Sequence, residues 1–370
     1  MGRTIPHTVI RADASITMGT GHIMRCMTLA KALRSKGWQV TFITRAFEGN
    51  LIEFIENEGF KVYVLPEKLD VPVEDSNYAT WLGVDWSVDA KQTAGILQQI
   101  NEEIDWLVVD HYAIDEKWES VLRTHVKQLF VIDDLANRVH NCDVLLDQNV
   151  MDDGSGLYSE LVSRETVQLL GPRYALLRPE FTRFREPTAQ KTLDPNRILV
   201  FFGGSDAANQ TQKALDALIM IENTKLAVDV VVGKGYPFID DLRSVCLKHQ
   251  MFSLHVQTTE MARLLSRAGI VVCAGGTNTW ERCCLGAPSV IVTVADNQVA
   301  IAQAVHNHGM ALYLGKSEDV TTQRLADTIH KLQKEPALLS AMSEKSFQMV
   351  DGKGVDRVVS ILDKIDGGKQ

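Results

Sequence analysis

Short runs of β-branched and other apolar residues alternate with helical patterns along almost the whole chain. In the first half these runs cover residues 8–12, 39–44, 61–65, 106–109, 129–132 and 144–146. Most are too apolar for a strand with one exposed face, so they predict parallel strands covered on both faces. Between them, residues 23–36 carry apolar side chains at helical spacing and stop at Gly37. The repeating unit is therefore predicted to be βαβ.

A second alternating series fills the other half, with expected strands at 198–202, 227–232, 270–273, 290–294 and 311–314. At 370 residues the chain is longer than a single hydrophobic core usually supports. We therefore predict an α/β protein with two doubly wound, Rossmann-like domains, residues 1–186 and 187–370, and a proline-containing linker at 185–197. The last helix is a candidate to return to the first domain. Such sheets bind ligands at the carboxyl ends of their strands, so the interdomain cleft is the expected site.

Composition limits the partners. The chain has 47 acidic and 38 basic residues and a net charge of -9, which argues against nucleic acid or an anionic membrane as a partner. Its six cysteines form no C-x-x-C motif and no metal-ligand spacing, so we expect reduced thiols, no metal and no cofactor. The sequence shows neither a signal-peptide pattern nor an apolar run long enough for a membrane span. We expect a cytoplasmic protein that is a monomer or a weak homo-oligomer.

The loop after the first expected strand carries the first candidate site residues. Gly19 and Gly21 lie at a strand-to-helix turn, where they allow a ligand to approach the backbone closely. Met24 stands where a dinucleotide-binding fingerprint has its third glycine, which argues against an NAD site. His22 lies in the first helical turn, where the helix dipole disfavours the imidazolium form. It is therefore a candidate base; the alternative is a histidine that caps the helix or fills a pocket.

Arg11 and Asp13 are charged residues at the end of an otherwise apolar expected strand. A charge in this position is costly unless it is paired or faces a cleft. A spacing of two places both side chains on the same face of an extended segment. Asp13 is therefore a candidate to orient His22 or a substrate hydroxyl. The alternative is a structural salt bridge between the two residues.

Further polar residues follow two neighbouring expected strands. Asp110, His111 and Tyr112 come after the fourth strand, and Asp133 and Asp134 come after the fifth. The carboxyl ends of parallel strands are where α/β enzymes place their working groups. Each residue also has a structural alternative, because the aspartates can cap a loop and Tyr112 can pack. Their convergence predicts a site more strongly than any one of them does.

Glycine-containing turns in the second half predict an anion site, because exposed backbone N–H groups at such turns suit a diphosphate. Glu281 lies in the first turn of a helix and is a candidate to accept hydrogen bonds from a ribose diol. The alternative is that its carboxylate only interacts favourably with the positive end of the helix dipole. Asn297 and Gln298 end the next expected strand with amide donors that face the same cleft. The turns themselves contain Gly203, Gly204, Ser205 and Asp206, and then Gly275, Gly276, Thr277 and Asn278.

Taken in order along the chain, these motifs resemble a known family. They are Arg11-x-Asp13, Gly19-x-Gly21-His22, Arg25, Asp110-His111-Tyr112, Asp133-Asp134, the segment 174–181, Gly203-Gly204-Ser205-Asp206, Glu281 and Asp296-Asn297-Gln298. Together they resemble the UDP-2,4-diacetamido-2,4,6-trideoxy-β-L-altropyranose hydrolases of pseudaminic acid biosynthesis. That family is related to the MurG-type glycosyltransferases, which have the GT-B fold. The resemblance runs through nearly the whole chain.

The resemblance implies a GT-B protein that hydrolyses a UDP-sugar at the anomeric carbon without a metal and releases UDP and the free sugar. It implies that His22, Asp13 and Tyr112 are catalytic and that Glu281 binds the uridine ribose. Residues 277–280 vary among relatives, so the resemblance fixes no hydrogen bonds there. The residues assigned to substrate binding, besides Glu281, are Arg11, Gly19, Gly21, Arg25, Gly203, Gly204, Ser205, Gly276, Thr277, Asn278, Asn297 and Gln298.

This chemistry needs fewer groups than an ordinary glycosidase. A glycosidase uses two carboxyl groups, one of which protonates a poor leaving group. A nucleoside diphosphate leaves as a weakly basic anion, so one base is enough if preorganised donors, worth about 3–4 kcal/mol each, meet the developing charge. Two other functions stay open: a glycosyltransferase that passes the sugar to an acceptor, and a binding module without turnover. The sequence lacks the membrane-facing stripe that a lipid acceptor favours.

Overall fold

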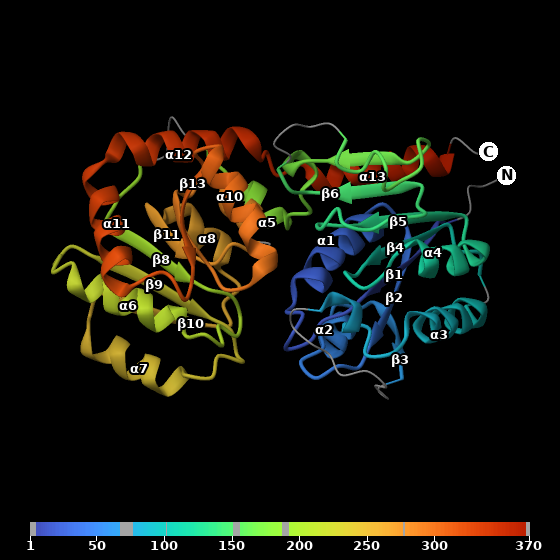
Figure 1. Cartoon of the computed structure of the whole chain (residues 1–370), viewed down its shortest axis with the longest axis horizontal. Coiled ribbons are helices and arrows are strands. Elements are labelled where there is room, and N and C mark those ends of the chain that lie inside the picture. The colour runs from blue at the N-terminus through green and yellow to red at the C-terminus, as the bar shows by residue number, and fades with distance from the viewer. Residues whose placement is uncertain are drawn as a thin grey trace. The chain divides into compact units, whose positions relative to one another are not determined.

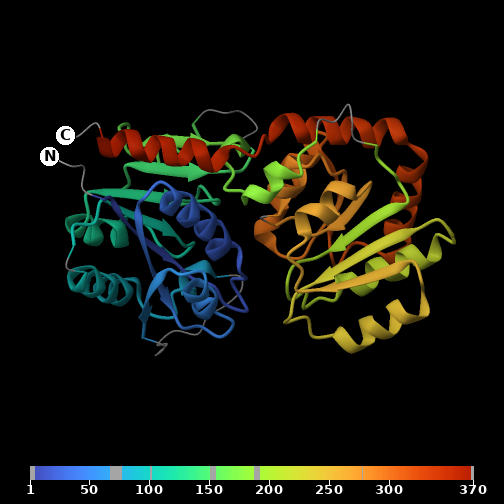
Figure 2. The same cartoon turned by 180° about the vertical axis from the view of Figure 1, so that it is seen from behind.

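The computed structural model describes residues 5–66, 77–100, 102–150, 156–186, 192–276 and 278–367. The chain divides into two compact units, of which the first combines Met1–Leu177 with Lys353–Gln370 and the second is Arg178–Gly352. Figure 1 shows one parallel sheet with helices on its faces in each unit, and Figure 2 shows the same elements from behind. The predicted α/β class is confirmed.

The first unit contains a seven-stranded sheet in the order β3-β2-β1-β4-β5-β6-β7, and the strand pairs are parallel. Its strands are β1 (His7–Ala12), β2 (Gln39–Arg45), β3 (Lys61–Leu65), β4 (Trp106–Asp110), β5 (Gln128–Ile132), β6 (Val144–Asp147) and β7 (Val167–Leu170). Its helices are α1 (Gly21–Ser35), α2 (Ile52–Asn57), η1 (Tyr78–Thr80), α3 (Trp86–Gln99), α4 (Glu116–Leu122), η2 (Arg123–His125), η3 (Pro172–Tyr174) and α13 (Gly354–Gly367).

Both faces of this sheet are buried, which explains why its central strands are apolar without alternation. Successive side chains of a strand point to opposite faces. Ile10 of β1 accordingly belongs to a core with α1 and α13, through residues such as Leu29 and Val358. Val9 belongs to a second core on the other face, together with Trp118 of α4.

The second unit contains a six-stranded parallel sheet in the order β10-β9-β8-β11-β12-β13, with one main core. Its strands are β8 (Arg197–Phe201), β9 (Ala227–Val232), β10 (Phe252–Val256), β11 (Ile270–Cys273), β12 (Ser289–Thr293) and β13 (Ala311–Lys316). Its helices are α5 (Pro179–Arg183), α6 (Gln210–Met220), α7 (Ile239–Lys248), α8 (Met261–Arg267), α9 (Thr279–Cys284), η5 (Asp296–Gln298), α10 (Val299–Asn307), α11 (Thr322–Lys334) and α12 (Pro336–Met349).

The eleven expected strands are present to within one residue at each end, except that β13 extends two residues further. The sequence missed β7 and β10, which lie at the edges of their sheets. Both expose about half of their residues, so neither reads as a buried apolar run. The helix expected at 23–36 is α1, and Gly37 after it has a φ of 85°, a conformation that favours glycine.

The units divide at Leu177, before the proline-containing segment that the sequence suggested as a linker. Side chains just before this segment and at its first residue bind the second unit. Thr182 donates to the carbonyl of Gly352, and Arg185 donates to the carbonyl of Phe347. These hydrogen bonds are the physical reason why residues 178–186 belong to the second unit. Helix α13 belongs to the first unit, where Val358 and Leu362 enter its core.

Candidate active site

Polar side chains lie together at the carboxyl edge of the first unit's sheet. Strands β1, β4 and β5 are neighbours, and Ala12 at the end of β1 pairs with Asp110 at the end of β4. Helix α1 begins at Gly21 after the loop that follows β1, and it carries His22 and Arg25. The edge therefore combines residues that are far apart in the sequence.

His22 and Asp110 form a buried dyad. His22 Nδ1 lies 2.6 Å from Asp110 Oδ1, and no described residue forms a hydrogen bond to Nε2. Burial alone would raise the pKa of Asp110, but Arg25 and His22 hold it well below its ordinary value. Because Asp110 is therefore a carboxylate, Nδ1 carries the proton and donates it. In this tautomer the lone pair lies on Nε2, as in the histidine of a Ser-His-Asp triad.

Arg25 binds both carboxylates beside the dyad. Its Nε and Nη2 donate to Asp110 at 2.6 and 2.7 Å, and its Nη1 donates to Asp134 at 2.5 Å. Burial opposes its charge, but Asp110 and Asp134 raise the pKa of Arg25 well above its ordinary value. Because its donors are used in this way, Arg25 holds the site together. The substrate-binding role that the resemblance implied for Arg25 stays a prediction.

Tyr112 supports the imidazole ring from the side. Its ring meets that of His22 edge-on at 4.6 Å, and its hydroxyl donates to Asp134 at 3.1 Å. Burial and then the charge of Asp134 raise the pKa of Tyr112, so the phenol stays neutral. Tyr112 is 9% exposed, which leaves it a small accessible surface.

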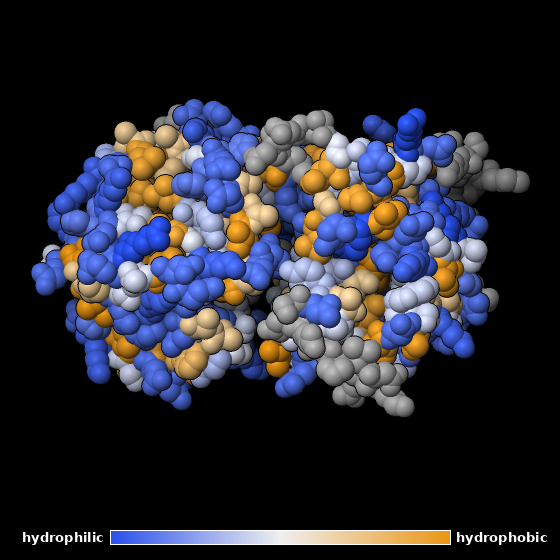
Figure 3. All heavy atoms as spheres, viewed as in Figure 1, coloured by the Kyte–Doolittle hydropathy of each residue, from blue (hydrophilic) through white to orange (hydrophobic). Residues whose placement is uncertain are grey.

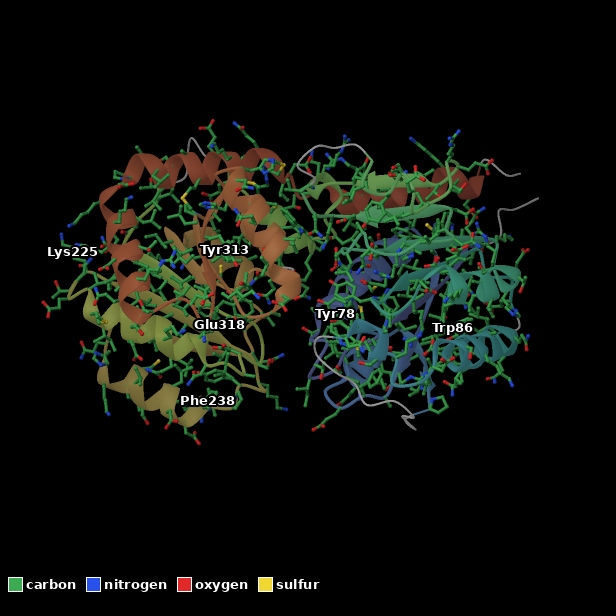
Figure 4. All side chains as sticks on the ribbon, viewed as in Figure 1. Tyr78, Trp86, Lys225, Phe238, Tyr313 and Glu318 are labelled. Atoms are coloured by element: carbon green, nitrogen blue, oxygen red, sulfur yellow. The ribbon has the colours of Figure 1, made fainter. Side chains whose placement is uncertain are left out.

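An aromatic cluster that the sequence did not single out lies behind this arrangement. Trp81 stacks on Tyr112 at 5.5 Å and meets His22 edge-on at 6.4 Å. Tyr78, labelled in Figure 4, lies 4.9 Å from Trp81 between ring centroids. Met18 and Phe47 complete the cluster, which we call the apolar wall. The available sequence signal is the aromatic segment that contains Tyr78, Trp81 and Trp86.

Arg11 and Asp13 belong to a separate network that is fully buried. Arg11 binds Asp13 at 2.6 Å and Asp89 of α3 at 2.9 Å. Asp13 also accepts hydrogen bonds from the backbone N–H of Arg45 at 2.7 Å and from the hydroxyl of Thr44 at 3.1 Å. Arg45 in turn binds Asp89 at 2.7 Å.

This network corrects one expected contact. The carboxylate that orients His22 is Asp110, and Asp13 has partners within its own network instead. Both Arg11 and Asp13 are 0% exposed, so the structure gives them the salt bridge that was the structural alternative. Burial alone would raise the pKa of Asp13, but Arg11 and His111 hold it far below its ordinary value.

Asp89→Asn tests whether this network is structural. The substitution leaves Arg11 and Arg45 buried with less counter-charge, so the free energy of unfolding should fall by about 3–5 kcal/mol. Chemical denaturation measures it. The control is Asp85→Asn on the same helix, because Asp85 is an exposed N-cap and asparagine caps equally well. A loss below about 1 kcal/mol, the size of an exposed ion pair, would contradict a structural role.

The glycines of the first loop have different roles. Gly19 has a φ of 71° and donates its N–H to the carbonyl of Ser15 at 2.9 Å, which closes a tight turn. Gly21 is the first residue of α1. The turn therefore sets the direction in which α1, and with it His22, leaves the sheet.

In the second unit, the turn after β8 is open. Gly204 and Ser205 are exposed, and Gly203 has a φ of 103°. The backbone N–H groups of these three residues donate no hydrogen bond within the described part of the chain. Asp206 instead accepts from the backbone N–H groups of Gln210 and Thr211, at 2.9 and 2.7 Å, and caps α6. The turn can therefore offer N–H donors to an anion.

The turn after β11 is fastened to the turn after β12. Gln298 Oε1 accepts from the backbone N–H groups of Gly275 at 3.3 Å and Val294 at 3.1 Å. This side-chain oxygen is therefore used within the protein. Gly276 accepts from Thr279 through its carbonyl, and Asn297 is half-buried in η5. Asn278 precedes α9, and Thr277 lies outside the described residues.

Glu281 is half-buried in α9 and has one cationic partner nearby. Arg178 Nη2 lies 3.4 Å from Glu281 Oε1, while Arg178 Nη1 binds Glu180 at 2.7 Å. Burial raises the pKa of Glu281, although Arg178 opposes this shift. The carboxylate is therefore only partly neutralised and keeps acceptor capacity for a hydroxyl pair.

The predicted residues thus form two groups. His22, Arg25 and Tyr112 meet around Asp110 and Asp134 in the first unit, and Arg11 and Asp13 lie in the neighbouring buried network. The glycine turns, Glu281, Asn297 and Gln298 lie in the second unit.

Other surface features lie apart from these residues. A groove of about 360 Å³ in the first unit is lined by Arg173 and Tyr174 and by one side of α13. No cluster of three or more potential metal ligands occurs within the described ranges. In the same ranges, no helix combines the length and apolarity of a membrane-crossing segment. Figure 3 shows hydrophobic and hydrophilic residues interspersed on the visible faces of both units.

Comparison with solved structures identifies the fold. MurG from Acinetobacter baumannii matches with a TM-score of 0.66 over 97% of this chain and 99% of that chain, at 15% identity. The chain has the GT-B fold. Within this GT-B chain, residues 198–358 match the glycosyltransferase family 28 C-terminal domain.

Two curated relatives match the GT-B chain over most of their length. The spore coat polysaccharide biosynthesis protein SpsG of Bacillus subtilis is 27% identical over 365 residues, 96% of this chain and 97% of that protein. The UDP-2,4-diacetamido-2,4,6-trideoxy-beta-L-altropyranose hydrolase of Campylobacter jejuni is 25% identical over 297 residues, 80% of this chain and 94% of that protein.

Proposed function

We propose that this protein hydrolyses a UDP-linked sugar at its anomeric carbon, with His22 as the base that activates water. The observation that carries the proposal is the His22–Asp110 dyad, in which Asp110 fixes the proton on Nδ1 at 2.6 Å and Nε2 has no described partner. A base must have its lone pair available in this way. The name of the Campylobacter jejuni relative supports this reaction, and the GT-B fold is compatible with it.

The second unit would hold the nucleotide. The N–H groups of Gly203, Gly204 and Ser205, which have no acceptor among the described residues, suit the diphosphate, because oriented backbone dipoles bind anions. Glu281 would accept hydrogen bonds from the ribose hydroxyls. These residues lie within residues 198–358, which match the glycosyltransferase family 28 C-terminal domain.

The sugar that we propose is a 2,4-diacetamido-2,4,6-trideoxy hexose. Its methyl groups and its missing 6-hydroxyl make it less polar than an ordinary hexose. The apolar wall of Met18, Phe47, Tyr78 and Trp81 beside His22 suits such a ligand. The relative from Campylobacter jejuni is named for a substrate of this type.

The test is incubation of the pure protein with UDP-2,4-diacetamido-2,4,6-trideoxy sugars in the absence of any acceptor. We expect release of UDP and of free sugar, with inversion at the anomeric carbon, because water attacks directly. A product that retains its configuration would indicate a covalent intermediate and contradict the single-base scheme. Binding of the UDP-sugar without any release would indicate a binding module.

A glycosyltransferase is the second candidate, because residues 198–358 match a glycosyltransferase domain. It would use the same nucleotide-binding residues and pass the sugar to an acceptor hydroxyl. The two candidates differ in one measurement. A transferase should release UDP appreciably only when an acceptor is added, whereas the hydrolase should release it in buffer alone.

Glu281→Ala tests the ribose contact. Loss of a charged acceptor should weaken UDP binding by about tenfold or more, since a hydrogen bond to a charged group contributes about 1.5–3 kcal/mol. Isothermal titration with UDP measures this effect. Glu180→Ala is the matched control, because Glu180 binds the same Arg178 at 2.7 Å. Equal UDP affinity in the two variants would contradict the ribose assignment.

A further inference from the structure

A second group of acidic residues lies beside the dyad, and one of its carboxyl groups holds a proton. The hydroxyl of Tyr158 lies 2.9 Å from Asp133 Oδ2 and also 2.9 Å from Asp147 Oδ2. A phenol has one hydrogen to donate, so it satisfies one carboxylate only. The other carboxyl must itself be protonated and donate to the phenol oxygen, since otherwise two lone pairs would face each other in a buried place.

The surroundings show which carboxyl holds the proton. Asp133 is paired with Arg138 at 2.8 Å, accepts from the backbone N–H of Ala136 at 2.9 Å, and lies 3.8 Å from His140 Nε2. Burial lowers the pKa of His140, but Asp133 and Glu119 raise it to about 9, so His140 is a cation at neutral pH. Asp133 therefore stays ionised.

Asp147 forms no ion pair with a cation among the described residues. Within the described residues, its carboxyl accepts hydrogen bonds from Tyr158 and from the backbone N–H of Asn149, at 2.9 and 2.8 Å, and both donors are neutral. Its side chain is buried at the end of β6. Asp133, Asp134, Tyr158 and Asn149 are the groups that act on its charge.

We propose that Asp147 is a positioning residue that acts as a protonated carboxylic acid, donates to Tyr158 and thereby leaves Asp134 as the carboxylate that binds Arg25 and Tyr112. Asn149 joins the two parts, because its backbone N–H binds Asp147 and its side-chain amide lies 3.5 Å from Asp134 Oδ1. An ionised Asp147 would add a third carboxylate beside Asp133 and Asp134. Its charge would act unfavourably on both of these carboxylates. The functional part of this inference rests on the proposed hydrolase function.

The pH dependence has a definite sign. Burial and the charge of Asp134 raise the pKa of Asp147 to about 8. In the unfolded chain an aspartate titrates near pH 4, at about 3.9. Between these two values the folded state retains a proton that the unfolded state has lost, so the stability supplied by this proton decreases as the pH rises. Above about pH 8 both states are ionised and the dependence ends.

Asp147→Asn is the main test, because the amide keeps the shape of the acid, can donate to Tyr158 and does not titrate. The melting temperature of the variant minus that of the wild type should increase as the pH rises from 5 to about 8, and level off above it. Asp240→Asn, at a surface carboxylate that is 91% exposed, should give a difference that does not change with pH. Parallel melting curves for wild type and Asp147→Asn would overturn the proposal.

A spectroscopic measurement tests the proton directly. Infrared spectra of protein with isotope-labelled aspartate should show a protonated carboxyl at pH 6 that disappears near pH 8. The band should be missing in Asp147→Asn. If that variant does not fold, Tyr158→Phe should shift the band instead, because it removes the hydrogen-bond partner of the acid. Absence of a protonated carboxyl from wild type at pH 6 would overturn the proposal.

The pH dependence of UDP-sugar hydrolysis tests whether the proton on Asp147 affects the His22–Asp110 dyad. Wild type should lose kcat/KM above about pH 8, and Asp147→Asn should keep it to higher pH. An alkaline loss that is the same in both proteins would contradict the positioning role of Asp147. If the protein cleaves no UDP-sugar, the melting and infrared measurements still decide where the proton lies. Failure of the proposed function is thus distinguished from failure of this inference.

Discussion

Replacing His22 by asparagine is expected to lower kcat for UDP-sugar hydrolysis by about 10²–10⁴-fold, the usual contribution of a general base. Asparagine can still donate to Asp110, so the hydrogen bond of the dyad and the fold should persist. It has no basic nitrogen to accept a proton from water. Steady-state turnover, together with UDP affinity measured by titration, checks this. The UDP affinity should stay close to that of the wild type, because the proposed nucleotide contacts are in the second unit.

His255→Asn is the matched control. His255 of β10 also binds an aspartate through a ring nitrogen, with Nε2 2.7 Å from Asp229, but it lies in the second unit. The same chemical change there should leave turnover unaltered. Near-normal turnover in His22→Asn would remove His22 from the role of base and leave its edge-on contact with Tyr112 as its main function.

Asp110→Asn is expected to have the second large effect. An amide group that donates toward His22 Nδ1 forces the ring proton onto Nε2, so the nitrogen that faces water is no longer basic. The corresponding change in a Ser-His-Asp triad lowers kcat by about 10⁴-fold through the wrong tautomer. We expect a loss of the same order here. Turnover and the imidazole ¹⁵N chemical shifts of His22, which report the tautomer, are the measurements.

In Asp110→Asn, a loss of turnover caused by lower stability must be distinguished from one caused by the changed His22 tautomer. Arg25 loses a buried counter-charge, so unfolding should become easier by up to about 3–5 kcal/mol. Asp134→Asn provides the comparison, because it removes the other carboxylate of Arg25 without contacting His22. Only Asp110→Asn should change the ¹⁵N shifts. A His22 tautomer that is the same in both variants would show that Asp110 supports the fold and not the base.

Much of the fold could be predicted from the sequence because buried parallel strands are apolar on both faces. β1, β4 and β5 are fully buried, and their apolar runs were visible without any tertiary information. The sequence did not predict the edge strands β7 and β10, because each is covered only in part and lacks a continuous apolar run. The division of the chain at Leu177 depends on hydrogen bonds such as that from Thr182 to the carbonyl of Gly352, which no spacing along the chain encodes.

The candidate site shows the same limit at the level of single residues. Asp13 and Asp110 both come at the end of an apolar strand, so spacing alone does not show which of them binds the His22 ring. The choice depends on the lateral order of the strands and on which charges lie nearby. Arg11 and the backbone N–H of Arg45 bind Asp13, and this leaves Asp110 to accept from His22.

The sequence by itself determined the alternating α/β pattern, the glycine turn before α1 and the position of His22 at the start of that helix. These features are local, because strand burial, turn geometry and helix starts depend on neighbouring residues. Only the tertiary structure decided that Asp110 orients His22, that Trp81 stacks on Tyr112 and that Asp147 must share a proton with Tyr158. Each of these depends on side chains from separate strands and loops that folding brings within hydrogen-bond or van der Waals distance, so no spacing along the chain encodes it.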